Sequence, residues 1–100
     1  MNNQRKLKAE IDKTHKKIRE GFEVFATLWD KVENAPDHGA KQRWTGELKK
    51  ELKKLQRMRD QIKAWMSNGV VKDTKEMEHH KHQIELKMEV FKELEREVMQ

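Results

Sequence analysis

The residues of this sequence best suited to chemistry are cations concentrated in its middle third. Residues 40–63 contain 9 Lys and Arg against 3 Asp and Glu, a net charge of +6, whereas residues 1–34 carry +2 and residues 73–100 carry −3. Localised positive charge of this kind is typical of a surface that binds a polyanion. The alternative is a solvated helix face that only keeps a small protein in solution.

On a helix, the leucines of residues 48–63 lie on one face and most of the cations on the other. Lys49 and Lys53 are one turn apart, as are Lys53 and Arg57, and one turn is about 6 Å along the axis. Such an array binds phosphate backbone and shape rather than base sequence, so folded RNA is the expected partner. We define the basic ridge as six cations of this segment: Lys49, Lys50, Lys53, Lys54, Arg57 and Lys63.

Histidines form the second group with chemical capacity. His79 and His82, or Glu78 and His82, are one turn apart and could share a metal ion. A zinc site normally has three or four ligands, and these side chains point to different sides of a helix. We therefore expect no metal site and no cofactor, with His80 packed on the apolar stripe.

Residues for covalent catalysis are scarce. The chain has no cysteine, its four glycines form no phosphate-binding loop, and its few hydroxyl side chains match no nucleophile motif. Long thin helices also enclose little volume for a substrate. We expect a protein that is not an enzyme.

Two clusters of turn residues divide the chain into three segments. Residues 34–39 contain the only proline, and residues 67–69 read Ser-Asn-Gly. In each segment, apolar residues recur at spacings of three, four or seven, which places them on one helix face. Intrinsic disorder is the alternative for a chain that is 34% apolar and 41% charged, but this periodicity argues against it.

The sequence predicts an all-α fold of one domain, an elongated antiparallel helical bundle or coiled coil of three long helices. The predicted helices span residues 4–33, 40–66 and 74–98. Thr14 is expected to fill a gap in the first apolar stripe, with Trp65 and Leu94 at the margins of the other two stripes.

Several apolar residues are candidates for contacts outside the core. Leu86 and Val90 lie off the third stripe, so they could meet a protein partner or a second copy of the chain in a homodimer, although scattered surface apolar residues are also common. Trp44 and Trp65, near helix ends, could stack on bases, with core packing as the alternative. No apolar run approaches the roughly 20 residues of a membrane span, so no membrane partner is expected.

Residues 48–65, which read LKKELKKLQRMRDQIKAW, closely resemble the signature of one family. That family is the N-terminal domain of subunits three and five of the eukaryotic NOT (carbon catabolite repression) deadenylase complex. Arg5-Lys6-Leu7 and Trp29 resemble its first helix, while Lys72-Asp73 and Ile84-Glu85 resemble its third. The resemblance covers nearly the whole chain, which we interpret as a fragment of a longer subunit or as a diverged paralogue.

The resemblance implies a non-catalytic module that docks on the ribosome at the exit site, among ribosomal RNA, transfer RNA and ribosomal proteins. Docking there would couple slow decoding to deadenylation and decay of messenger RNA. Other NOT subunits are implied partners through regions outside this chain. The implied location is the cytoplasm, with the nucleus left open.

When the family's RNA contacts are transferred to the matching positions of this sequence, the resemblance implies contacts at the basic ridge. The second candidates are Lys13, Lys16 and Lys17. Val90 stands where the family usually has a basic residue, and Lys81-His82 stands where it often has Arg-Lys. The third helix is therefore more acidic than the family pattern, and we expect the RNA contacts on the first two helices.

Overall fold

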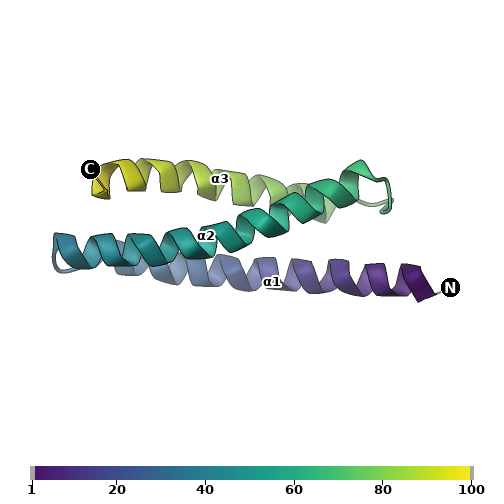
Figure 1. Ribbon diagram of the computed structural model, residues 1–100, viewed down its shortest axis with the longest axis horizontal. Coiled ribbons are helices and arrows are strands. Elements are labelled where there is room, and N and C mark those ends of the chain that lie inside the picture. Colours follow the sequence, from purple (N-terminus) through teal and green to yellow (C-terminus); the bar gives the residue numbers. More distant parts are fainter. Residues whose placement is uncertain (1, 100) are drawn as a thin grey trace.

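Three long helices make up the computed structural model, which describes residues 2–99 and contains no strand within them. Helix α1 spans Asn2–Glu33, α2 spans His38–Ser67 and α3 spans Lys75–Val98. Successive helices run antiparallel and form a rod of 56 × 18 × 16 Å (Figure 1). The predicted elongated all-α architecture is confirmed. Among the described residues, no helix is long and apolar enough to cross a membrane.

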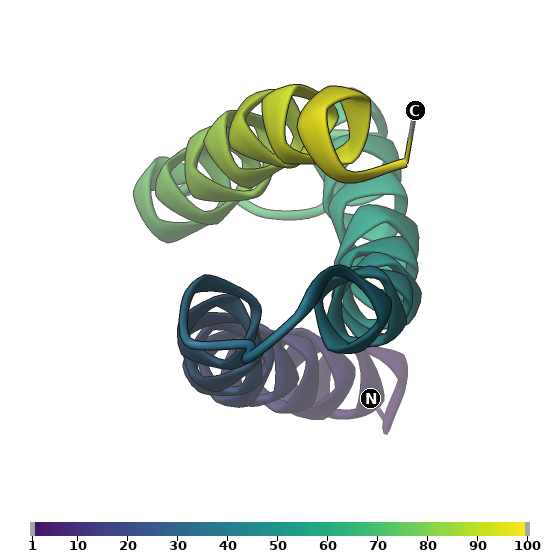
Figure 2. The ribbon, with the colours of Figure 1, turned by 90° about the vertical axis from the view of Figure 1, so that its left-hand side faces the viewer.

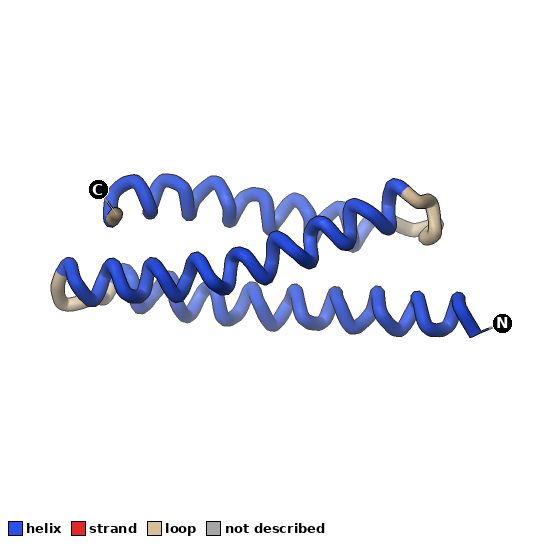
Figure 3. The backbone as a smooth tube through the Cα atoms, viewed as in Figure 1, coloured by secondary structure: helices blue, strands red, loops and turns tan. Residues whose placement is uncertain are grey.

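Turn residues set both ends of the central helix, and Figure 3 shows the loops at the two ends of the rod. The Asp37 carboxylate accepts a hydrogen bond of 2.8 Å from the backbone N–H of Ala40. This cap lets α2 begin at His38, two residues before the predicted start. After Ser67, Gly69 adopts a positive φ of 65°, the left-handed conformation that ends a helix.

Helix α2 is the centre of the arrangement. Viewed along the rod, the helices form an open C: α1 and α3 each pack along α2 and make few contacts with each other (Figure 2). The core lies on the inner faces of the three helices, where the predicted apolar stripes meet. Its buried apolar side chains are Ile18, Phe25, Val32, Leu48, Leu52, Leu55, Ile62, Trp65, Met77, Ile84, Phe91, Leu94 and Val98.

Three core positions differ from the stripe predictions. Trp65 and Leu94, expected at the margins, belong to the core with exposed fractions of 7% and 8%. Thr14 is only half-buried, and the gap in the first stripe is closed by His15, which is 4% exposed. His15 follows Ile11 by four residues and precedes Ile18 by three, so its ring falls on the same face of α1.

Candidate nucleic-acid interface

The centre of the basic ridge lies on the outer face of α2. Lys50, Lys53 and Arg57 are all exposed, and a helical turn of 100° per residue places them within about 60° of one another, opposite the core. Among residues 4–99, Lys53 and Arg57 have no acidic partner within ion-pair distance. Lys50 Nζ lies 3.3 Å from Glu47 Oε1, in an exposed pair that contributes little and breaks easily.

The remaining ridge residues lie nearer the flanking helices. Lys49, expected on the outer face, turns toward α3, where its Nζ lies 2.8 Å from Glu95 Oε2. Lys63 follows two heptads later and is exposed on the same side of α2. Lys54 is exposed and its Nζ lies 3.6 Å from Glu51 Oε2.

The acids of α3 neutralise one flank of α2. Arg59, the half-buried cation of the same segment, lies 3.1 Å from Glu85 Oε2 and 3.0 Å from Asp60 Oδ1. Hydrogen bonds from Lys81 and, with a smaller effect, from Arg59 lower the pKa of the Glu85 carboxyl below its usual range, so this acid stays charged. Most of the excess positive charge therefore faces outward and toward α1, and Lys63 is the exposed ridge cation on the α3 side.

Two of the three candidate lysines of α1 lie against α2. Lys13 and Lys17 line a shallow groove of about 310 Å³ between α1 and α2, together with Gln61 and Trp65 of α2. Lys16 is exposed but does not line the groove, because one residue turns a helical side chain by 100°. The structure thus brings Lys13 and Lys17, but not Lys16, beside the helix that carries the basic ridge.

Neither tryptophan proposed for base stacking presents a free ring. Trp65 is buried, so its indole is a core side chain. Trp44 is half-buried and is covered by cations of its own chain: Lys31 Nζ lies 4.5 Å and Arg43 Cζ 5.4 Å from the ring centroid. A nucleic acid on this surface would meet charge rather than aromatic platforms.

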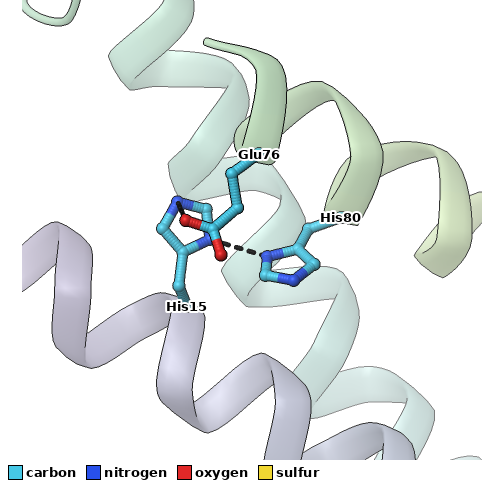
Figure 4. A group of neighbouring side chains, drawn as sticks. All are labelled: His15, Glu76 and His80. Carbon is cyan, nitrogen blue, oxygen red and sulfur yellow. Dashed lines mark hydrogen bonds and ion pairs between the residues drawn. The ribbon is translucent and has the colours of Figure 1, made fainter. Parts of the chain in front are cut away.

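A second group of functional side chains joins α1 to α3. His15 and His80 are both 4% exposed, and their Nδ1 atoms lie 2.6 Å apart (Figure 4). Glu76, one turn before His80, places Oε1 3.8 Å from His15 Nε2, while its Oε2 accepts a hydrogen bond of 3.1 Å from Arg19. His80 is buried on the apolar stripe, as predicted. Its contact with His15 was not predicted.

The electrostatics of this group favour neutral imidazoles. Burial, reinforced by the nearby His15, lowers the pKa of His80 from 6.5 to about 4. Burial also lowers the pKa of His15, with Glu76 opposing the shift. Neutral imidazoles and a carboxylate are metal ligands, and the candidate ligand atoms of the three residues lie within 4.8 Å of one another.

Sequence reasoning missed His15, although one signal was present. Its spacing from Ile11 and Ile18 marks a buried position, and a buried histidine needs a polar partner. The histidines singled out for their proximity in sequence, His79 and His82, are both exposed. Adjacency along the chain was the wrong criterion, because helices bring together residues from different segments.

Comparison with known proteins agrees with the family resemblance. Residues 3–100 match the family model Not3, described as the Not1 N-terminal domain, CCR4-Not complex component. The chain is 44% identical over 94 residues to general negative regulator of transcription subunit 3 of Schizosaccharomyces pombe, which covers 94% of this chain and 15% of that relative. It is 38% identical over 93 residues to subunit 3 of Saccharomyces cerevisiae, covering 92% of this chain and 11% of the relative.

The chain is also 41% identical over 96 residues to general negative regulator of transcription subunit 5 of Saccharomyces cerevisiae. The match covers 93% of this chain and 17% of that relative. The chain thus spans less than a fifth of the length of each of these three relatives. The family model covers almost the whole chain, and the relatives include both subunit types suggested by residues 48–65. This chain belongs to the Not3 family, the N-terminal domain of CCR4-Not complex components.

Proposed function

We propose that this chain is a non-catalytic module of a CCR4-Not subunit that docks on ribosomal RNA through the outer face of α2. The observation that carries the proposal is the exposed group of Lys50, Lys53 and Arg57, in a segment of net charge +6. Lys13 and Lys17 extend this surface onto α1. In the full proposal the docking place is the ribosomal exit site, so that slow decoding leads to deadenylation and decay of the messenger RNA.

The shape and charge of the molecule support an RNA partner over an acidic protein partner. Lys50, Lys53 and Arg57 span about 10 Å of the α2 axis, and together with Lys13 and Lys17 they can contact several phosphates of one backbone. The cations lie on a helix surface without an exposed apolar centre, whereas protein interfaces usually bury apolar and aromatic anchors. Such a surface binds by charge and shape and depends strongly on salt.

The proposed cellular location follows from the proposed partner, the ribosome. A ribosome-docking module works in the cytoplasm. The three relatives are named general negative regulators of transcription, so a nuclear pool is part of the same proposal.

Charge reversal with a matched control tests the proposal. The variant Lys50→Glu, Lys53→Glu, Arg57→Glu changes the net charge by −6 without touching Lys49, whose pairing with Glu95 links α2 to α3. The control changes the net charge equally at the far end of the rod, by Lys6→Glu, Lys72→Glu and Lys75→Glu, three exposed positions. Co-sedimentation with purified ribosomes is expected to be lost for the first variant and kept for the control.

A second function has its own observation. Leu86 and Val90 are 46% and 47% exposed on α3, so this face could bind a protein or a second copy of the chain. In that case the module would act as a scaffold arm without RNA contact. Leu86→Ser with Val90→Ser would then abolish the association, and a homodimer would appear in light scattering as a mass that rises with concentration. A constant monomer mass would exclude the homodimer.

A further inference from the structure

Two buried imidazoles from different helices point their Nδ1 atoms at each other. His15 on α1 and His80 on α3 have Nδ1 atoms 2.6 Å apart and ring centroids 4.7 Å apart. Two neutral rings in this position have to share something between them, either a proton or a cation, since a lone pair facing a lone pair is repulsive. The Glu76 carboxylate, one helical turn before His80, lies beside this pair, with Oε1 3.8 Å from Nε2 of His15 (Figure 4).

The geometry points to a site for a divalent transition-metal ion, with zinc as the preferred ion, formed by His15, Glu76 and His80. Two imidazole nitrogens and one carboxylate oxygen are a ligand set that zinc accepts, with water completing a tetrahedral site. The three candidate ligand atoms already lie within 4.8 Å of one another. Burial keeps both imidazoles neutral at neutral pH, which is the form that binds a metal ion.

Binding requires small movements that the surroundings permit. Two nitrogens bound to one tetrahedral zinc ion are about 3.3 Å apart, so the two rings separate by less than about 1 Å from their present contact. Glu76 is exposed, and it exchanges its ion pair with Arg19 for the metal ion. A cavity of about 580 Å³ beside the site is lined in part by Asp12, His15 and Glu76, and it gives water and ions access to two of the ligands, His15 and Glu76.

The position of this site gives the metal a structural role. Helices α1 and α3 make few contacts with each other and are held together mainly through α2 (Figure 2). A metal ion bound by His15 from one helix and by Glu76 and His80 from the other would join α1 directly to α3. The bound ion would therefore raise the thermal stability of the whole domain.

Zinc and cobalt titrations of this chain, freed of metal with a chelator, test the inference. Calorimetry is expected to give one ion per chain, and zinc at about 100 times its dissociation constant should raise Tm by roughly 10–20 °C. Cobalt should give the intense visible absorption of a tetrahedral site. Two ligand variants, His15→Asn and the conservative exposed change Glu76→Gln, should each weaken binding at least tenfold.

The exposed histidines of α3 supply the matched control. His79→Ala with His82→Ala removes two histidines from the same helix without touching the three ligands, and it should leave stoichiometry and Tm shift unchanged. Loss of binding in this control, with binding retained in Glu76→Gln and His15→Asn, would show surface chelation and overturn the inference. Absence of any Tm shift or heat in the unmodified chain would overturn it as well, leaving a proton as the group shared by the two rings.

Discussion

Replacing Gly21 with alanine measures how closely α1 packs on α2. A Cβ atom at this position would lie 2.8 Å from Leu55 Cδ2 and 3.4 Å from Leu55 Cγ. Leu55 is fully buried, so its side chain has little room to move away. Overpacking of this kind costs about 1–3 kcal/mol. Alanine also gains about 1 kcal/mol of helix propensity over glycine, so the net change is a loss of about 0–2 kcal/mol.

Gly46 provides the matched control on α2. It is helical like Gly21, but a Cβ atom added there meets no other atom within 4 Å. Gly46→Ala therefore keeps only the propensity gain of about 1 kcal/mol, which raises Tm by roughly 4–8 °C in a domain of this size. Thermal unfolding followed by circular dichroism should give Gly21→Ala a Tm at least about 4 °C lower than that of Gly46→Ala. An equal rise of Tm in both variants would refute the close approach of α1 and α2 at Gly21.

Three further predictions concern stability. Asp37→Ala removes the cap of α2 and should lower the free energy of unfolding by about 1 kcal/mol in urea titrations, whereas an unchanged midpoint would show that the cap is dispensable. Gly69→Ala forces an alanine to a φ of 65° and should cost about 1 kcal/mol by the same assay, and any gain in stability would contradict that backbone conformation. The pKa of His80 is lower in the folded chain than in the unfolded one, so stability is complete above about pH 6.5 and is lost as the pH falls toward 4. Between pH 7 and pH 5 the loss should be about 2 kcal/mol with a chelator present, and it should shrink in His80→Gln; an unchanged urea midpoint at pH 5 would contradict a buried neutral imidazole.

The helices were predictable because their signals are local. Apolar spacing gives the inner face of each helix, and the clusters around Pro36 and Gly69 end two of them. The cation array of α2 was predictable for the same reason, since Lys50, Lys53 and Arg57 are close along one helix. These features depend on sequence separation alone.

Features that depend on the register between helices were not predictable. The pairing of Lys49 with Glu95 requires a particular alignment of α2 with α3, which the pattern of either segment leaves open. The meeting of His15 with His80 joins positions 65 residues apart. The offset of Trp65 from the leucine stripe predicts a position at the margin of the contact. In the structure α2 packs against helices on two sides, so it buries a wider face that includes Trp65.

Sedimentation of this chain with purified ribosomes, with the exit site either empty or filled by transfer RNA, shows whether the domain docks at that site. If five cations contact phosphates, namely Lys13, Lys17, Lys50, Lys53 and Arg57, affinity should fall roughly 100- to 500-fold between 50 and 200 mM salt. The triple reversal of the α2 residues should leave only about a tenfold fall from an already weak affinity. We expect binding to ribosomes with an empty exit site and loss of binding when the site is filled. Binding that is indifferent to occupancy and to the triple reversal would contradict the proposed docking.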